Sequence, residues 1–485
     1  MGIVLKQSFQ NTIITFIGFT FGAVNTLFLY TNILQPEYYG LVTFILATGA
    51  ILMPLFAFGA HNTLVKFYSA QEEGSKNAFL TLVIVSPLLV LIPAVGITWA
   101  FYDDIAAFLS QKNAIVTDYV WYFFLVGLAM AYFEVFFAWS KVHLKSVFGN
   151  FMKEVFARLC ITVLLILLYF DSISLAFFFK ALVAVYLLRT ILMKLYAFSL
   201  RRPKLNFSFP KESKVILQYG MLMVLGGSVA LILMEIDKFM INQFISIENV
   251  AYYGVAVYIA TVISVPNRAM NQITYPMTAE YLNQGNLFEL ENLYKKTSLT
   301  SLIASGLLFI LIIVNIDDLY LMIPEAYRDG FTIVFIIGMV KVFDSFLGNI
   351  NAVLYYSKYY KTVLLFGICF ALTTILLNLW LIPLLGIEGA ALASFIAIFL
   401  FNSIKMIFVK LKFGMLPYSN STLKVFGLLL LLGFLFSYLT LSLHPLLSIA
   451  LKSIFVLLIY LGVLHRFQIS EDVSILIAKL LRRTK

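Results

Sequence analysis

Long apolar runs, separated by short polar segments, follow one another along the whole chain. Most of these runs exceed about 18 residues, the length at which an apolar helix crosses a bilayer. The pattern predicts an all-α polytopic membrane protein with about 14 transmembrane helices. The predicted spans are residues 9–34, 38–60, 78–101, 114–139, 147–169, 173–195, 215–246, 250–280, 297–315, 330–357, 361–382, 386–409, 423–442 and 446–464.

The second and eighth runs begin in the same way. Each opens with the tripeptide Tyr-Tyr-Gly, at residues 38–40 and again at residues 252–254. Each also contains a proline further inside, Pro54 in one and Pro266 in the other, where a helix is expected to kink. We therefore expect two homologous helix bundles with a site between them.

The repeat gives a predicted division of the chain. Residues 1–200 are expected to form an N-terminal six-helix lobe, and residues 215–412 a C-terminal six-helix lobe. Residues 201–214 form a basic cytoplasmic linker, whose charges also suit an anchor on anionic lipid. Residues 413–485 carry two further helices and a cytoplasmic amphipathic tail.

Two stretches outside the spans have an amphipathic pattern. Residues 286–296 and 469–483 place apolar side chains at helical spacing, with charged side chains on the opposite face. Both stretches fit helices that lie on the membrane surface.

The composition agrees with a membrane protein throughout. The 485 residues are 62% hydrophobic and 12% charged, with a mean hydropathy of +0.96, which excludes a soluble globular protein of this size. Residues 9–34 are too long for a cleaved signal peptide and are expected to remain as the first span. Cys160 and Cys369 lie within apolar runs, so we expect packing roles for them and neither a disulfide nor a metal site.

Lysines and arginines are concentrated in alternate loops. With fourteen spans, 24 of them fall in loops on the side of the termini, and only Lys112 and Arg328 fall in loops on the other side. This asymmetry predicts that both termini are cytoplasmic. It also accounts for the net charge of +10 without a nucleic-acid partner.

Charged side chains also lie inside the predicted spans, where each is costly unless it faces a cavity or a partner. The basic ones are Lys153, Arg158, Lys180, Arg189, Lys238, Arg268, Lys341 and Lys452. The acidic ones are Glu134, Glu154, Glu235, Asp237 and Asp344. The surplus of basic residues favours an anionic substrate over a cationic one.

Two of these cations are the first candidates for contact with such a substrate. Arg268 follows the Pro266 kink and has no acid three or four residues away, and Lys341 lies near the middle of the tenth run. Arg189 and Lys180 come second. They are nine residues apart in the sixth run and are expected to follow one face, with snorkelling to the membrane surface as the alternative.

Glu134 and Asp344 are candidates for binding a coupling ion, H⁺ or Na⁺. Glu134 has no partner on its own helix nearer than Lys141. Asp344 lies one turn from Lys341, and the two either form a structural salt bridge or belong to the site.

The remaining intramembrane charges have local explanations. Glu154 and Arg158 are spaced to pair along one helix. Glu235, Asp237 and Lys238 cluster towards the outer end of the seventh run, and local pairing is expected there as well. Lys452 lies in the last run and is expected to reach the lipid headgroups.

Motifs for catalysis, cofactors and metals are absent from the sequence. It contains no P-loop, no paired-cysteine motif and no nucleophile elbow. The predicted outer loops are short, which disfavours an enzyme with a folded external domain. We therefore expect no catalytic residue, no cofactor and no bound metal.

Four phrases carry a resemblance to a known family: LQPEYYGL at 34–41, EIDKFMI at 235–241, VAYYGVA at 250–256 and GIEGAALA at 386–393. In their order and spacing they resemble the polysaccharide transporter (oligosaccharide flippase) family of the multidrug/oligosaccharidyl-lipid/polysaccharide exporter superfamily. The resemblance implies two six-helix lobes around a central cavity in a bacterial inner membrane. It implies alternating access that moves a polyprenyl-pyrophosphate-linked oligosaccharide from the inner to the outer leaflet.

The implied partners are the lipid-linked oligosaccharide, membrane lipids and the polysaccharide polymerase machinery. Precursors of O-antigen, capsule or exopolysaccharide would all suit this expectation. Two other functions stay open: a cation-coupled multidrug exporter of the same fold, and a membrane glycosyltransferase or polymerase. The basic interior disfavours the first, and the short outer loops disfavour the second.

Overall fold

Helices make up nearly all of the structure, which is a computed structural model. It describes residues 3–208, 210, 212–224, 229–437, 439 and 441–470. Helices account for 85% of the chain, and no strand occurs within those ranges. Nine helices of the described part are long and apolar enough to cross a membrane, and further apolar helices are shorter. The predicted all-α polytopic fold is confirmed.

The first six predicted spans correspond to helical segments to within a few residues, with short helices between them. In chain order these segments are α1 (Ile3–Ala23), the π-helix η1 (Val24–Leu29), α2 (Tyr30–Ile33), α3 (Pro36–Phe56), α4 (Ala60–Phe67), η2 (Tyr68–Ala70), α5 (Lys76–Val85), α6 (Leu88–Ala100), α7 (Tyr102–Leu109), η3 (Ala114–Tyr119), α8 (Val120–Val142), α9 (Val147–Phe151), the π-helix η4 (Met152–Phe156), α10 (Ala157–Tyr169) and α11 (Leu175–Leu200).

The later spans also correspond to helical segments, except that the ninth, predicted at 297–315, is much longer. The segments are α12 (Ser213–Leu222), α13 (Val229–Phe244), α14 (Glu248–Thr261), η6 (Val262–Ser264), α15 (Val265–Gln284), α16 (Leu287–Leu321), η7 (Glu325–Gly330), α17 (Phe331–Phe346), α18 (Ile350–Tyr355), α19 (Tyr360–Phe413), α20 (Asn420–Ser437) and α21 (Pro445–Arg466). The predicted amphipathic tail at 469–483 lies, from residue 471 onward, outside the described residues.

Glycine and proline set several of these boundaries. The eleventh and twelfth predicted spans run together in α19, but Gly386 has φ 61° and ψ −136°, which breaks the helix between them. A Cβ atom on Gly389 would lie 2.1 Å from the Leu381 carbonyl oxygen, so this break also depends on a second glycine. Pro36 and Pro445 begin α3 and α21, where the missing N–H has no cost.

The amphipathic stretch 286–296 is not a separate surface helix. It continues without interruption into the ninth span as the first turns of α16. Leu290 and Tyr294 are fully buried in the hydrophobic core, so their periodicity marks a packing face and not a lipid-facing one. An apolar stripe with charges opposite has the same appearance in either environment, which explains the wrong prediction.

Two compact units emerge from the contacts within the chain. The first comprises residues 1–254 and 367–390, and the second comprises residues 255–366 and 391–485. The lobe limits expected from the repeat, 1–200 and 215–412, remain a prediction.

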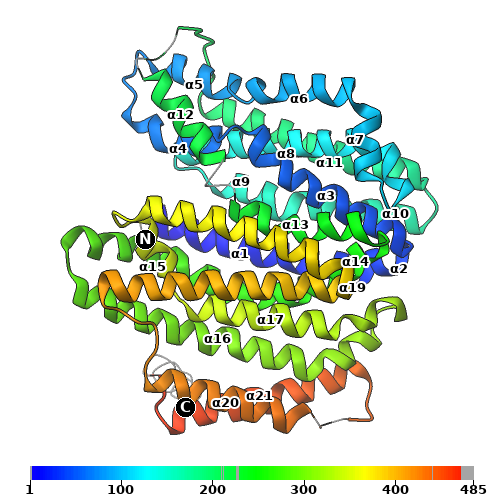
Figure 1. Cartoon of the computed structure of the whole chain (residues 1–485), viewed down its shortest axis with the longest axis vertical. Helices are drawn as coiled ribbons and strands as arrows, with labels where there is room; N and C mark the ends of the chain where they lie inside the picture. Colours follow the sequence, from blue (N-terminus) through cyan, green and yellow to red (C-terminus); the bar gives the residue numbers. More distant parts are fainter. Residues whose placement is uncertain are drawn as a thin grey trace. The chain divides into compact units, whose positions relative to one another are not determined.

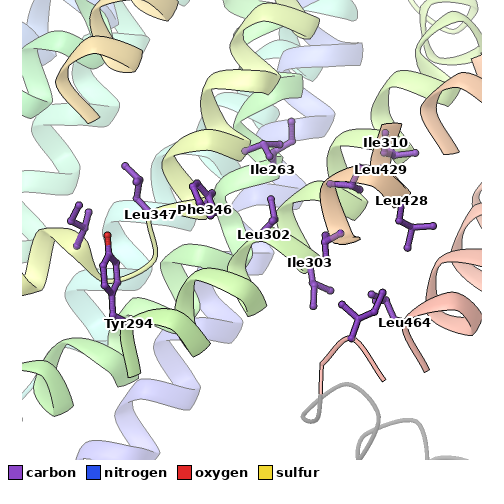
Figure 2. Packing of buried hydrophobic residues seen from close by; sticks show 14 of the residues in the cluster. Ile263, Tyr294, Leu302, Ile303, Ile310, Phe346, Leu347, Leu428, Leu429 and Leu464 are labelled. Carbon is purple, nitrogen blue, oxygen red and sulfur yellow. The ribbon is translucent and has the colours of Figure 1, made fainter. Parts of the chain in front are cut away.

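In the second unit, α16 packs against both C-terminal helices, and the three lie side by side (Figure 1). Figure 2 shows Ile303 and Ile310 of α16 close to Leu428 and Leu429 of α20 and to Leu464 of α21. All five side chains are buried. Because lipid is as apolar as these side chains, such contacts stabilise the packing through van der Waals attraction and not through removal from water.

A buried ion pair adds to this contact. The Lys452 Nζ of α21 lies 2.9 Å from the Asp318 Oδ2 of α16, and the Ser448 hydroxyl donates to the same oxygen at 2.7 Å. The exposed fractions of Lys452 and Asp318 are only 5% and 8%. The prediction that Lys452 reaches the lipid headgroups is therefore wrong, because a carboxylate on a neighbouring helix neutralises it inside the protein.

In the first unit, the two Tyr-Tyr-Gly copies lie at closely packed helix starts. A Cβ atom on Gly40 would lie 2.0 Å from the carbonyl oxygen of Ile247, the residue before α14. A Cβ atom on Gly254 would lie 3.3 Å from the Thr43 side chain of α3. The repeated glycine thus allows close contact between α3 and the region where α14 begins.

Asn113, just before η3, joins the same region. Its side-chain amide donates to the carbonyl oxygens of Asn242 and Ile245 at 2.9 and 3.0 Å. Its side-chain oxygen accepts from the backbone N–H of Ile247 at 2.9 Å. The Asn242 side chain in turn donates to the Leu109 carbonyl at 3.0 Å. This network joins the predicted outer loop before η3 to the end of α13.

Candidate functional site

The first unit gathers charged side chains from neighbouring helices. The Lys153 Nζ of η4 lies 2.6 Å from the Glu134 Oε1 of α8. The Glu134 side chain is 14% exposed and the Lys153 side chain 44% exposed. Lys141, two turns further along α8, is also within electrostatic range of the Glu134 carboxylate. Glu134, for which the sequence offered no close partner on its own helix, therefore has one on another helix.

A π-turn provides this partner. Lys153 and Glu154 lie in η4, and the π-helix η1 in the first span contains Asn25. The Asn25 amide donates to the Arg158 carbonyl at 2.9 Å, and its oxygen accepts from the Thr162 hydroxyl at 2.7 Å. π-turns disturb the regular hydrogen bonds of a helix, and they often mark functional sites. Here the Asn25 side chain of η1 joins the first span to α10, the helix that follows η4.

Arg158 and Glu154 pair along their helix as expected, at 3.3 Å. The arginine Nη1 also donates to the Glu154 carbonyl at 3.1 Å. Helix α1 lies close above this pair, since a Cβ atom on Gly18 would be 2.9 Å from the same Nη1. The absence of a side chain at Gly18 therefore leaves room for the guanidinium.

Arg189 of α11 is the most enclosed cation of this group. It is 6% exposed, and its guanidinium carbon lies 4.3 Å from the ring centre of Phe133 and 4.7 Å from that of Tyr186. Its Nε forms no hydrogen bond with the described residues. A buried guanidinium beside two aromatic rings, with a donor to spare, suits an anionic ligand such as phosphate.

Cations exceed carboxylates in this group, which we call the cationic cluster. It contains Lys141, Lys153, Arg158 and Arg189, with Glu134 and Glu154 as the acids. His61 at the start of α4 lies within electrostatic range of Glu134. The net charge of the cationic cluster is positive whether or not His61 is protonated. The arrangement can therefore hold an anion in addition to its own two carboxylates.

The second unit holds another set of polar side chains. Asp344 of α17 accepts a hydrogen bond of 3.2 Å from the Asn402 amide of α19. Lys405, one turn further along α19, is 3% exposed, and its Nζ donates to the Asn351 side-chain oxygen at 3.0 Å. The charges of Lys405 and Asp344 interact. Lys405 is one of the 24 basic residues counted in the loops on the side of the termini, but α19 continues through it to Phe413, so it lies within a helix.

The other predicted cations differ in their exposure. Arg268 lies exposed on α15, and Lys341 lies half-buried on α17 three residues before Asp344. Lys180 lies exposed on α11. The expectation that Lys180 shares a face with Arg189 is wrong, because nine residues at about 100° each place them on opposite sides of a helix. The structure thus brings Arg189 and Glu134 into one neighbourhood and leaves Lys180 outside it.

An apolar pocket of about 430 Å³ lies in the second unit. It is lined by side chains of α16, α17, α19 and α20, among them Phe309, Phe343, Phe399 and Phe426. Val342 and Phe343 of its lining follow Lys341 directly on α17. Part of the pocket lining thus belongs to the same turn of α17 as Lys341, a predicted contact for an anionic headgroup. The lining itself is entirely apolar.

Asp237 has an environment that the sequence did not indicate. It is 6% exposed and accepts hydrogen bonds from the Tyr253 hydroxyl at 2.7 Å and from the Asn378 amide at 2.8 Å. Its neighbour Lys238 pairs locally with Glu235 at 2.7 Å, as expected for this cluster. In the described part of the chain, no three His, Cys, Asp or Glu side chains are grouped so that they could hold a metal ion.

Comparison with known proteins assigns this architecture to a family. Residues 4–282 match the profile of a family described as "Polysaccharide biosynthesis protein". No curated protein matches the sequence significantly.

Solved structures show the same fold at low sequence identity. The lipid II flippase MurJ in an inward closed conformation is 16% identical, with a TM-score of 0.73 over 95% of this chain and 99% of that one. An outward-facing multidrug resistance MATE family transporter of the MOP superfamily is 15% identical, with a TM-score of 0.55 over 85% and 95% of the two chains. A MOP superfamily transporter from Pyrococcus furiosus is also 15% identical, with a TM-score of 0.54 over 86% and 96%.

Proposed function

Because this chain belongs to the family of polysaccharide biosynthesis proteins, we propose that it is a flippase for a polyprenyl-pyrophosphate-linked oligosaccharide. The lipid-linked sugar would cross from the inner to the outer leaflet of a bacterial inner membrane. It would then supply O-antigen, capsule or exopolysaccharide synthesis. The shared fold with a lipid II flippase and with multidrug transporters supports a transporter over an enzyme.

The observation that carries the proposal is the positive balance of the cationic cluster. A lipid-linked oligosaccharide has a pyrophosphate as its charged group, and phosphate oxygens are bound best by Arg and Lys. Arg189 offers an unused donor in a buried position, and Lys153 is held by Glu134 alone among the described residues. An incoming phosphate can therefore replace Glu134 at Lys153.

This replacement suggests how transport is coupled to an ion. Once Lys153 contacts the phosphate, Glu134 loses its neutralising partner and gains affinity for H⁺ or Na⁺. Asp344, with Asn402 and Lys405 around it, is the second candidate for ion coupling. Arg268 and Lys341 stay proposed contacts for the substrate headgroup in the second unit, and Lys180 is a weaker candidate because it is exposed.

The polyprenyl chain has a suitable place as well. The apolar pocket beside Lys341 presents Phe343, Phe399 and other apolar side chains, and no charged side chain lines it. A hydrocarbon chain could lie there while its pyrophosphate is held by cations, so the apolar part need not leave the membrane. Transport would then require only rearrangement of helices, without a covalent step.

A cation-coupled multidrug exporter is the second candidate, and the fold it shares with MATE transporters favours it. A drug exporter of this class would need acidic side chains facing its cationic substrate. The cationic cluster has the opposite balance, so we rank this function below the flippase. We also propose that the protein contacts the polysaccharide polymerase machinery and that both of its termini are cytoplasmic.

The test is flipping of a fluorescent polyprenyl-pyrophosphate sugar in vesicles that contain the purified protein. Arg189→Gln and Lys153→Gln should each slow flipping by about tenfold or more, because a hydrogen bond to a charged group contributes about 1.5–3 kcal/mol. Arg268→Ala and Lys341→Ala test the contacts in the second unit. Lys112→Gln, an equal loss of charge at an exposed loop position, is the control and should flip at the wild-type rate.

The outcomes separate the candidates. Wild-type flipping in all four site variants would exclude these residues as the headgroup site. If the protein flipped no lipid-linked sugar but exported cationic drugs in response to an acid or sodium gradient, the exporter would replace the flippase as the function.

A further inference from the structure

A second cavity, of about 720 Å³, lies within the first unit, and no member of the cationic cluster lines it. Its walls are side chains of α5, α8 and α11, and the start of the linker closes one end. Leu128, Tyr132, Phe136 and Leu187 make most of the lining apolar. This volume is in the range of pockets that bind small amphiphilic molecules, about 300–1,000 Å³.

The charged groups of this cavity are all at the linker end. Lys194 of α11 and Arg202 of the linker line it, and no acidic side chain does. Neither cation has an acidic partner among the described residues. Arg201, next to Arg202, is different, since its Nη1 lies 3.6 Å from Glu73 and 3.3 Å from the Tyr68 hydroxyl. Arg201 therefore fastens the linker to Glu73 and Tyr68, whereas Arg202 lines the cavity.

The walls are held in place by hydrogen bonds. The Thr190 hydroxyl donates to the Ala129 carbonyl at 2.7 Å, which joins α11 to α8. The Tyr132 hydroxyl donates to the Ile84 carbonyl at 3.3 Å, which joins α8 to α5. The Asn206 N–H donates to the Thr81 hydroxyl at 3.0 Å and fixes the linker over α5. A cavity formed in this way exists before a ligand enters.

We propose that this cavity binds an anionic phospholipid of the cytoplasmic leaflet. Its acyl chain would lie along the apolar walls, and its phosphate would lie between Lys194 and Arg202. An uncharged or zwitterionic lipid would leave the two cations without a net negative partner. Free phosphate would meet the cations but leave the apolar walls unfilled. The linker that joins the predicted lobes would thereby be tied to an acidic lipid. This proposal is independent of the transported substrate.

Native mass spectrometry of the full-length protein in detergent, titrated with phosphatidylglycerol, tests the proposal. The double variant Lys194→Gln/Arg202→Gln should bind the lipid about 25-fold more weakly, since each basic side chain near an acidic headgroup contributes about fivefold. The matched control is Lys204→Gln/Lys214→Gln, which removes the same charge from exposed linker positions outside the cavity. It should retain wild-type affinity.

A second variant guards against an indirect effect of lost charge. Leu205→Glu places a carboxylate at the exposed rim of the cavity and should weaken binding without removing either cation. Melting of each variant without lipid should match wild type, because all substituted side chains are exposed. Equal binding of phosphatidylcholine with the same acyl chains, equal loss in the control, or displacement of the lipid by inorganic phosphate would each overturn the proposal.

Discussion

Helix α21 is held on α16 by the buried pair of Lys452 and Asp318, and removing one partner tests how much this pair contributes. Lys452→Met keeps the length of the side chain but leaves Asp318 with the Ser448 hydroxyl as its remaining partner among the contacts described here. Asp318→Leu leaves the lysine ammonium buried. The double variant Lys452→Met/Asp318→Leu replaces both charges with apolar groups.

The burial of the pair determines the expected magnitudes. Because both residues are less than 10% exposed, either single variant leaves an uncompensated charge. Each single variant should lose about 3–5 kcal/mol of stability. The double variant should recover most of this loss, since replacing a buried pair by apolar groups is often neutral or stabilising by about 1–4 kcal/mol. The pattern of two costly single variants and a mild double variant is the specific prediction.

Unfolding of the purified protein in detergent, followed over a denaturant series, gives the free energies for a double-mutant cycle. Lys295→Met is the control on the same helix, because the pair of Lys295 and Glu291 is 42% and 35% exposed and should contribute only about 0.3–0.5 kcal/mol. If Lys452→Met cost no more than this control, or the double variant were as unstable as the sum of its parts, the pair would not fasten α21.

Three further predictions concern the first unit. Gly40→Ala should destabilise the protein by about 1–3 kcal/mol in the same unfolding assay, while Gly254→Ala should cost less, because the nearest atom is a backbone oxygen in one case and a side-chain methyl in the other. Asn113→Ala removes the acceptor of the Ile247 N–H and a donor to the Asn242 carbonyl, so hydrogen exchange of the Ile247 amide should speed up. The pKa of Glu73 lies below its ordinary value of 4.5, mainly because Lys76 donates a hydrogen bond to its carboxylate. The nearby charge of Arg201 in the linker lowers this pKa further. A spin label on the linker should therefore stay immobile above pH 4.5 and become mobile as the pH falls through the lowered pKa, and Glu73→Gln should be mobile at every pH.

The course of the helices was predictable because one physical rule dominates it. In a bilayer every backbone N–H and C=O must bond within the helix, so the lengths of apolar runs nearly determine the spans. Even the division of α19 is visible in the sequence, since Gly386 and Gly389 lie between two apolar runs. The exception was residues 286–296, where polar side chains lie on a helix that is packed and not surface-bound.

Pairing within a helix was predictable, whereas pairing between helices was not. Glu154 and Arg158 pair because their spacing along one helix brings them together. The partners of Glu134 and Lys452 come from other helices, 19 and 134 residues away. Sequence spacing contains no information on helix rotation or neighbours, and a π-turn such as η4 shifts the face further. Lys405 lies inside the predicted span 386–409 but was counted with the loop residues, so its burial was missed.

The ion pairs in the cationic cluster also bear on how the protein stays folded while no anion is bound there. An isolated group of cations in a low dielectric would be costly, and Glu134 and Glu154 offset part of this cost while no ligand is present. Carboxylates on flexible side chains make suitable temporary partners, because a phosphate can replace them without moving the backbone. The rings of Phe133 and Tyr186 also stabilise the charge of Arg189, in addition to the nearby carboxylates. Under the proposed function, the cluster would thus combine a rigidly held arginine with lysines that exchange partners, which suits a site that must both bind and release an anion.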